Sequence, residues 1–314
     1  PVTISTGPLS PEEVIAVARH GAPIELSAAS LSAMAESRAV IDALVTDDKP
    51  HYGVSTGFGA LATKQIPIEL RTQLQRSLIR SHAASSGTEV DREVVRGLML
   101  NRLSTMATGR TGVRPMVAQG YAAMLNAGIT PVVGEYGSLG CSGDLAPLAH
   151  CALALMGEGE VRNNDGALVP AAEALAAAGL EPVELREKEG LALINGTDGM
   201  LGMLVMAIND LRMLLKAADI TAAMSVEAQL GTDRVFAPEL QAIRPHPGQA
   251  ASAANPAPHP AGTTVEMVVT VHGPDGDRPG EGPLLLWEGT STYLGRGVHL
   301  AGQPRADRTA REEF

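Results

Sequence analysis

The 314-residue sequence predicts a mainly α-helical fold, and three observations lead to this prediction. Helix-start signals recur along the first two thirds of the chain, residues 197–229 are rich in Met, Leu and Ala with few breakers, and extended segments are scarce. Hydrophobic residues make up 45% of the chain but aromatic residues only 3%, so the core must be built from Leu, Ala, Val and Met.

The first predicted helix has the clearest start. Ser10-Pro11-Glu12-Glu13 combines an N-cap, a proline at the first helical position and an acid at the third, which is a capping box for a helix that stops at Gly21. Caps and terminal glycines predict further helices over residues 30–45, 68–84, 91–109 and 115–126. Asp144 is well placed to cap a sixth helix.

Residues 197–229 predict one long helix whose apolar residues cover much of its circumference. Such a helix is typical of a bundle interior or a subunit interface. Short strands are expected only near residues 129–133 and 161–169, so strands contribute little to the predicted fold.

The end of the chain has a different composition. Residues 251–314 hold 9 glycines and 7 prolines, with no Lys and no Ile, and no helix-length periodic segment survives these breakers. A hairpin from Thr263 to His272 and from Leu284 to Val298 is the one regular feature we expect there. We hypothesise that this tail is a frameshifted reading of an ordinary C-terminal half, which resequencing of the gene would test.

Three regions are therefore expected. Residues 1–196 would form an N-terminal active-site domain, residues 197–249 the beginning of a central helical bundle, and residues 250–314 an irregular tail rich in Gly and Pro.

The bulk properties exclude several classes of protein. A formal net charge of −11 argues against nucleic acid or an anionic membrane as the main partner. Two cysteines provide no disulfide framework and fit a reducing cytosol. No signal peptide is visible, and Asn209, Asp210 and Arg212 interrupt the most apolar segment, which argues against a membrane span. We expect a soluble cytoplasmic protein.

The triplet Cys141-Ser142-Gly143 lies in a Gly-rich stretch and can cyclise on itself. The amide nitrogen of Gly143 attacks the carbonyl carbon of Cys141, and loss of two waters leaves a five-membered ring that carries the former Ser142 as a methylidene. Glycine suits the attacking position because it has no Cβ to oppose the close approach. The product is an electrophile, which ordinary side chains do not supply.

Two other kinds of site are less compatible with this stretch. A serine hydrolase elbow needs Gly-x-Ser-x-Gly, but Asp144 stands where the last glycine belongs. Cys141, His150 and Cys151 could suggest a metal, but they lack a fourth ligand at sensible spacing, so no metal is expected.

The stretch from Gly137 to His150 resembles the signature of the aromatic amino acid ammonia-lyases, although Cys141 replaces the usual alanine. The resemblance implies a 4-methylideneimidazol-5-one group built from Cys141, Ser142 and Gly143, with no external cofactor. It implies that Asp144 assists the cyclisation. The match extends over about residues 5–249, which is roughly half the length of a family member.

Three more segments support the resemblance. The Gly-rich loop around Tyr52 resembles the loop that carries the family's catalytic base, so Tyr52 would remove the β-proton. Ser81-His82 matches the specificity position of histidine-specific members, so His82 would bind an imidazole substrate. Asn195, in the segment Leu193-Ile194-Asn195-Gly196, matches the asparagine beside the prosthetic group.

The resemblance therefore implies covalent elimination of ammonia from L-histidine to give urocanate. An aminomutase shares the prosthetic group, but Ser81-His82 favours the lyase. In the family the sites are shared within a homotetramer and completed by residues of the C-terminal half. An inactive fragment is therefore the most serious alternative, beside a related ammonia-lyase or aminomutase that acts on another aromatic amino acid. We expect poor solubility or aggregation, and little or no activity, from this chain alone.

Overall fold

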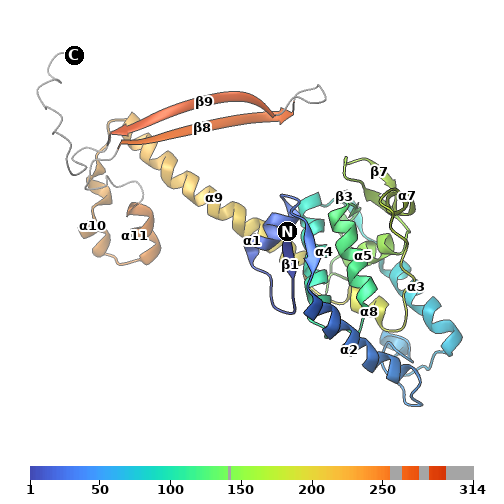
Figure 1. Cartoon of the computed structure of the whole chain (residues 1–314). Helices are drawn as coiled ribbons and strands as arrows, with labels where there is room; N and C mark the ends of the chain where they lie inside the picture. Colours follow the sequence, from blue (N-terminus) through green and yellow to red (C-terminus); the bar gives the residue numbers. More distant parts are fainter. Residues whose placement is uncertain (141–142, 255–263, 276–282, 295–314) are drawn as a thin grey trace, which may run out of the picture. The chain divides into compact units, whose positions relative to one another are not determined.

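The computed structural model describes residues 1–140, 143–254, 264–275 and 283–294, the last two ranges as backbone only (Figure 1). The fold is mainly α-helical, as predicted. The chain divides into two compact units, Pro1–Asp210 and Leu211–Phe314, so the division falls inside a long helix. The boundaries expected at residues 196 and 249 remain predictions.

The first unit contains the predicted helices, including the beginning of the long one, and two short additional helices, α7 and α8, precede the long helix. Their bounds are α1 Pro11–Ala18, α2 Ala28–Val45, α3 Arg71–His82, α4 Arg92–Ala107, α5 Pro115–Asn126, α6 Leu145–Leu155, α7 Ala171–Ala177, α8 Glu189–Ile194 and α9 Asp198–Ala228. The capping box of α1 is confirmed, because the Ser10 hydroxyl accepts from the Glu13 amide at 3.2 Å and the Glu13 carboxylate accepts from the Ser10 amide at 2.7 Å.

The helix expected over residues 68–84 is shorter than predicted. It opens with a 3-10 turn over Ile68–Leu70, and a second such turn, Gly59–Leu61, lies in the loop before it. Helix α3 then ends at His82, because Ala83 leaves the helical region with φ −74° and ψ 68°.

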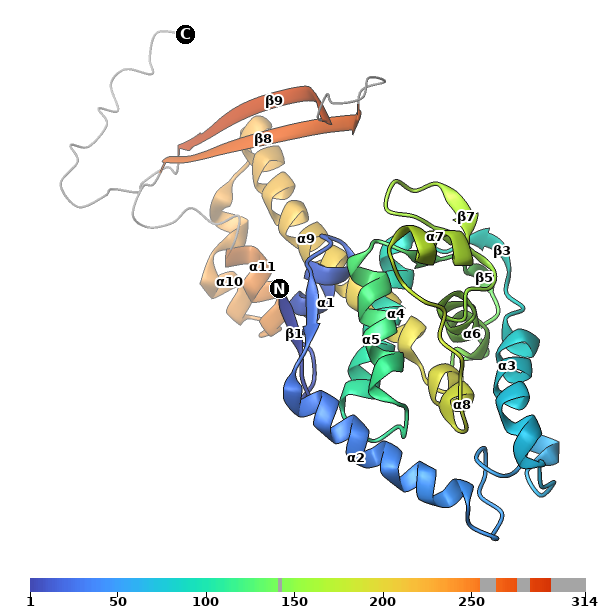
Figure 2. The ribbon, with the colours of Figure 1, turned by 45° about the vertical axis from the view of Figure 1, so that its right-hand side comes forward.

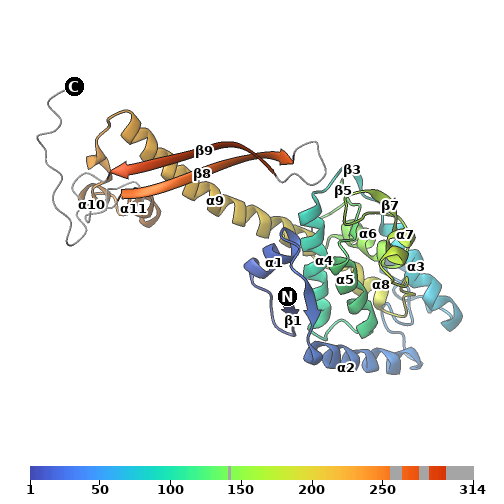
Figure 3. The ribbon, with the colours of Figure 1, turned by 45° about the horizontal axis from the view of Figure 1, so that its top comes forward.

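Helix α4 lies at the centre of the first unit and is buried around most of its circumference. It packs against α1, α5 and the first turns of α9, and α2 lies across the ends of α4 and α5 (Figures 2 and 3). Gly202 permits the close approach of α9, since a Cβ there would lie 3.2 Å from the Val94 carbonyl oxygen. Three polar or charged residues of α4 are buried as well, namely Arg96, Asn101 and Arg102.

Short strands surround this helical core. β1 (Val2–Ile4) pairs in parallel with β2 (Ile24–Leu26), and β3 (Ser86–Glu89) pairs with β5 (Gly134–Tyr136). β4 (Thr130–Pro131), β6 (Glu160–Arg162) and β7 (Leu168–Pro170) form a three-stranded antiparallel sheet. The strands near residues 129–133 and 161–169 were predicted. The others are too short to show a period in the sequence.

The second unit holds the rest of α9, a 3-10 turn over Asp233–Phe236, α10 (Pro238–Ala242), α11 (Pro247–Ala254) and an antiparallel hairpin. The hairpin strands are β8 (Thr264–Asp275) and β9 (Pro283–Leu294), so the expected hairpin forms with shifted ends. The frameshift hypothesis for this part of the chain remains a prediction.

The single long helix expected over residues 197–229 is confirmed by α9, and within the described residues of this single chain only its first turns are buried, so its place in a bundle interior or a subunit interface stays a prediction. Its buried residues are Asp198, Gly199, Gly202 and Met206, all in the first turns. Leu204, Leu211 and Leu214 are 54%, 53% and 64% exposed. The burial was predicted from composition, which specifies an apolar surface but not what covers it.

By length and composition, the run Glu189–Ala228 is apolar enough to cross a membrane. The core helix of a soluble protein passes the same test, and this run includes the non-helical Asn195 at the end of α8. The absence of a membrane span therefore stays a prediction.

Candidate active site

The predicted site residues lie in four segments of the first unit. They are the loop at Tyr52, the end of α3 at His82, the turn before α6 at Gly143, and the α8–α9 connection at Asn195. Cys141 and Ser142 lie outside the described residues. Backbone contacts join the Gly143 turn directly to the α8–α9 connection. A contact from the start of α8 reaches the Tyr52 loop, and a contact from α6 reaches the segment after α3.

Gly143 occupies a position that only glycine can fill. Its φ of +147° lies where L-residues rarely go. A Cβ at this position would also overlap the backbone oxygen and nitrogen of Gly196. The third residue of the triplet is therefore packed directly against the α8–α9 connection.

Asp144 precedes α6 as predicted, but its side chain does not cap that helix. The carboxylate, 1% exposed, accepts instead from the Gly199 amide at 2.7 Å and the Met200 amide at 2.9 Å. It also accepts from the Ser138 hydroxyl at 2.5 Å. Asp144 thus caps the first turn of α9. The prediction was wrong because it considered only the following helix, whereas the free amides lie 55 and 56 residues away.

Asn195 ends α8 and is exposed, with extended backbone angles of φ −96° and ψ 94°. The next residue, Gly196, accepts a hydrogen bond from the Asp144 amide through its carbonyl, at 2.5 Å. Asn195 is therefore adjacent to the residue that contacts the Gly143–Asp144 turn, and its place beside the prosthetic group stays a prediction.

Tyr52 is 49% exposed in a Gly-rich loop. Its hydroxyl accepts weakly from the Gly59 amide at 3.4 Å, and its ring meets Phe58 edge to face with centroids 5.9 Å apart. The Lys188 ammonium lies 5.9 Å from the ring centroid, within cation–π range. The Lys188 amide also donates to the Gly53 carbonyl at 3.1 Å, so this loop is attached to the start of α8.

His82 is partly buried at the end of α3. Its Nδ1 lies 2.9 Å from the Leu78 carbonyl oxygen and 3.0 Å from the Ser81 hydroxyl. A carbonyl oxygen can only accept, so Nδ1 carries the proton and Nε2 of the neutral ring has the lone pair. The Leu78 carbonyl therefore sets the tautomer of His82, and the Ser81 hydroxyl, which itself donates to that carbonyl, can accept from the same Nδ1–H.

His150, in the middle of α6, connects this helix to the segment that follows α3. The Ser85 amide donates to His150 Nε2 at 3.2 Å, and burial lowers the pKa of His150. His150 is therefore an acceptor inside the fold, which assigns it a structural contact.

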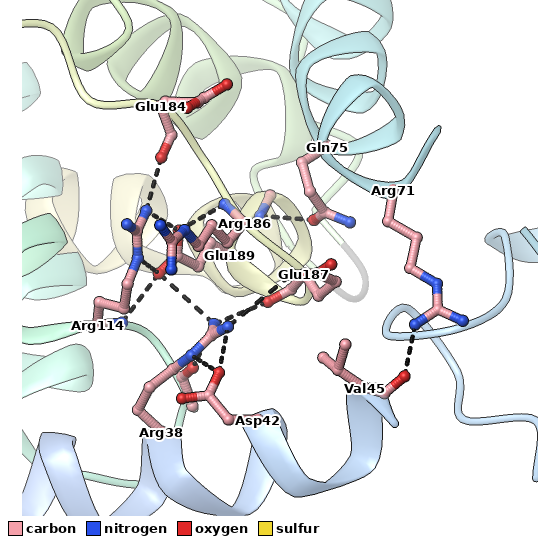
Figure 4. A network of polar contacts seen from close by, with 12 residues as sticks. Arg38, Asp42, Val45, Arg71, Gln75, Arg114, Glu184, Arg186, Glu187 and Glu189 are labelled. Atoms are coloured by element: carbon pink, nitrogen blue, oxygen red, sulfur yellow. Dashed lines mark hydrogen bonds and ion pairs between the residues drawn. The ribbon is translucent and has the colours of Figure 1, made fainter. Parts of the chain in front are cut away.

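A buried polar network holds the start of α8 (Figure 4). The Glu189 carboxylate, fully buried, accepts from the Arg114 side chain at 2.8 Å through both Nε and Nη2, and from the Arg186 amide at 2.7 Å. Arg38 lies 3.6 Å away and donates to the Glu187 carbonyl. Gln75 of α3 accepts from the Gly190 amide at 2.9 Å. Helices α2, α3 and α5 thereby fix α8.

The backbone of Lys188, just before α8, is strained. Its φ of 72° is left-handed, which costs free energy for any residue other than glycine. Burial lowers the pKa of the Lys188 ammonium. This strained residue is the one that contacts both the backbone and the ring of the Tyr52 loop.

The end of α8 rests on a second buried network. Arg102 of α4 pairs with Asp198, the first residue of α9, and donates to the Ala192 carbonyl at 3.0 Å. Burial raises the pKa of Asp198 and is the dominant influence on it. Burial also raises the pKa values of the neighbouring Tyr121 and Cys151, so all three acidic groups are held toward their protonated forms.

Arg102, Asp198, Glu189 and Lys188 are parts of the site that the sequence patterns did not reveal. One signal was available for Arg102, because Arg96, Asn101 and Arg102 interrupt the apolar residues in the middle of α4. Charged residues in a helix that becomes buried must find buried partners.

The chain was then compared with known proteins. The family model described as aromatic amino acid lyase matches residues 9–269. The chain is 67% identical over 254 residues to a histidine ammonia-lyase of Streptomyces griseus, covering 81% of this chain and 49% of that protein. It is 49% identical over 247 residues to a histidine ammonia-lyase of Gloeobacter violaceus, covering 79% and 48%.

Solved structures include relatives with different activities. A tyrosine aminomutase from Streptomyces globisporus matches with a TM-score of 0.76 and 39% identity, covering 82% of this chain and 48% of that one. A histidine ammonia-lyase from Trypanosoma cruzi matches with a TM-score of 0.75 and 35% identity, covering 81% and 49%. The chain spans about half the length of the relatives it matches.

Proposed function

This chain belongs to the aromatic amino acid lyase family, and on that premise we propose that it carries the N-terminal part of a site that eliminates ammonia from L-histidine to give urocanate. The observation that supports this most strongly is the Gly143–Asp144 turn packed against Asn195-Gly196. The protein is accordingly a carbon–nitrogen lyase by family resemblance.

The residues present fit a 4-methylideneimidazol-5-one formed from Cys141, Ser142 and Gly143. The positive φ of Gly143, and the lack of space for a Cβ there, match the requirement of ring closure for glycine at this position. When formed, the group supplies an electrophile that turns the substrate amine into a leaving group.

The chain's own residues hold and prepare this place. Asp144, fixed by two amides of α9, keeps the turn against Gly196. Asn195, exposed beside the turn, can offer its amide to the substrate's amine or carboxylate. Tyr52 is the proposed base for the β-proton, and its exposed hydroxyl has only a weak hydrogen bond to give up.

Selectivity for histidine would come from His82. Its Nδ1–H is occupied by the Leu78 carbonyl and the Ser81 hydroxyl, so a neutral ring presents Nε2 as an acceptor for the N–H of a substrate imidazole. An apolar residue at this position could not make that bond, and the substrate imidazole would be left unpaired.

An aminomutase is the second candidate, because several similar solved structures are tyrosine or phenylalanine aminomutases. That activity would return ammonia to the β-carbon. The relatives of highest identity among those above are named histidine ammonia-lyases, which favours the lyase.

Sensitive detection of urocanate from L-histidine by the purified chain tests the proposal, with Ser142→Ala as the matched control and L-tyrosine as a parallel substrate. We expect urocanate above the Ser142→Ala background, formed slowly because the chain spans half the length of its relatives. A cytoplasmic location is part of the same proposal, whereas the homotetramer is what the resemblance implies for family members of full length and is not proposed for this chain alone.

Three results would change it. A β-amino acid product would favour the aminomutase. No urocanate above background from a cyclised triplet would mean that this chain is an inactive fragment. Turnover at the rate of a full-length relative would refute the expectation that this chain alone is impaired.

A further inference from the structure

Two buried charges lie directly behind the Gly143–Asp144 turn. Arg102 and Asp198 have side chains only 3% and 7% exposed, and they form an ion pair between α4 and the first residue of α9. Arg102 also donates to the Ala192 carbonyl at 3.0 Å, and the Asn101 amide donates to the Asp198 carbonyl at 3.2 Å. The pair therefore connects α4 to the end of α8 and the start of α9.

The ion pair encloses Gly196. A Cβ on Gly196 would overlap the Arg102 guanidinium and the Asp198 carboxylate, so no side chain fits between them and the backbone. On its other side Gly196 accepts from the Asp144 amide and packs against Gly143. The order of contact is thus the ion pair, then the Gly196 backbone, then the last residue of the triplet.

The start of α9 reinforces this arrangement. Asp198 is followed by Gly199 and Met200, whose amides donate to the Asp144 carboxylate at 2.7 and 2.9 Å. The segment that the ion pair fixes therefore holds the turn twice, once through the Gly196 carbonyl and once through these two amides. Displacement of Asp198 would loosen both attachments together.

The Arg102–Asp198 pair is incompletely satisfied for an ion pair that serves only to stabilise the fold. Arg102 Nε has no hydrogen-bond partner within the described residues, and burial disfavours the charged form of Asp198. Apolar residues of similar volume would often stabilise such a place as well or better. A buried pair kept at this cost fits a role in fixing one geometry.

We propose that Arg102 and Asp198 are positioning residues that hold Gly196 against the Gly143–Asp144 turn, so that the Gly143 amide nitrogen is fixed for ring closure. This inference rests on the proposed function. Closure forms a bond from that nitrogen to the Cys141 carbonyl carbon. One water leaves with the carbonyl oxygen and the amide hydrogens of Gly143 and Ser142, and the other with the Ser142 hydroxyl and its Cα hydrogen, so no oxidant is needed.

The test measures amide hydrogen exchange at Asp144, Gly199 and Met200, together with the mass of the peptide that contains residues 141–143. The variants are Arg102→Met, Asp198→Asn and their combination, which removes both charges and so leaves no uncompensated ion. Arg96→Met is the matched control, because Arg96 is equally buried on the same helix but donates to the Val17, Ala18 and Leu125 carbonyls.

We expect exchange at the three amides to accelerate about tenfold or more in the pair variants, since each amide loses a supported hydrogen bond. The fraction of chains that have lost two waters should fall in parallel, and Arg102→Lys should recover part of both. In Arg96→Met, the exchange rates of the three amides should change no more than the change in its global stability accounts for. The fraction of chains that have lost two waters should stay at the wild-type level.

Unchanged exchange at Asp144 in folded pair variants would overturn the inference, even if the triplet cyclises. A wild-type triplet that stays uncyclised, with exchange that still depends on the pair, would instead refute the proposed function and leave the positioning role standing.

Discussion

Helix α8 (Glu189–Ile194) has a buried arginine–carboxylate network at each end, and the two networks differ in how completely they are satisfied. At the start, Glu189 accepts from two side-chain nitrogens of Arg114 and from the backbone amides of Arg114 and Arg186. At the end, Arg102 and Asp198 leave one guanidinium nitrogen unpartnered among the described residues. Both networks therefore pair arginine with a carboxylate, but the Glu189 network satisfies its arginine and its carboxylate more completely.

The contrast extends to the charges. The hydrogen bond to Glu189 raises the pKa of Arg114, so this pair stabilises its own ionised form. Burial dominates at Asp198 and raises its pKa, so its ionised form is held at a cost. We infer that the Glu189 network stabilises the fold, whereas the Arg102–Asp198 network maintains the geometry of the triplet.

The largest effect on stability is expected from Glu189→Gln. Replacing this carboxylate by an amide removes the negative charge that faces the buried Arg114 and Arg38 side chains and one of its two acceptor oxygens, which should lower the free energy of unfolding by about 3–5 kcal/mol in urea titrations. Asp42→Asn is the control, since Asp42 pairs with the same Arg38 but is 60% exposed and should cost at most about 1 kcal/mol. Equal losses in the free energy of unfolding for Glu189→Gln and Asp42→Asn would contradict the stabilising role inferred for the Glu189 network.

A smaller loss is expected from Gly143→Ala. Backbone strain and overlap with Gly196 should together cost about 2–4 kcal/mol, and the triplet should fail to lose two waters. Gly140→Ala is the control, because Gly140 has φ +69° but an open surrounding, so only strain of about 1–2 kcal/mol applies. If the Gly143→Ala variant cyclised normally, the close packing on Gly196 would have no part in ring closure.

The smallest effect concerns pH. Burial lowers the pKa of His150 below its ordinary 6.5, so below pH 6.5 the unfolded chain binds the proton more readily than the folded one. The free energy of unfolding should therefore fall as the pH drops from 6.5 toward the lower pKa of His150 in the folded chain. Above pH 6.5 His150 should have no effect on it.

His150→Gln keeps an acceptor for the Ser85 amide and should flatten that part of the profile. Urea midpoints compared at pH 7.5 and 5.5 would show this. The same acid loss in both proteins would assign the effect to other groups.

Much of the fold follows from local signals. The capping box at Ser10 and the proline that starts α5 specify helix starts from adjacent residues alone. The need for glycine at position 143 also follows from local chemistry, and the structure adds that Gly196 leaves no room for anything larger.

The parts that could not be predicted depend on partners distant in sequence. Arg102 pairs with Asp198, 96 residues later, and Asp144 caps a helix that starts beyond three other helices, α6, α7 and α8. Neither pairing has a spacing that a sequence pattern could reveal, because both arise only when α4, α6 and α9 pack together. The apolar surface of α9 shows a related limit, since its composition specifies an apolar face but not which partner covers it.

We propose throughout that this chain shapes its own residues 141–143 into an electrophile. Mass spectrometry of the peptide that contains these residues is the decisive experiment. We expect a wild-type peptide lighter by two water molecules, and a Ser142→Ala peptide that keeps its full mass. A wild-type peptide with an intact Ser142, from a chain shown to be folded, would contradict it.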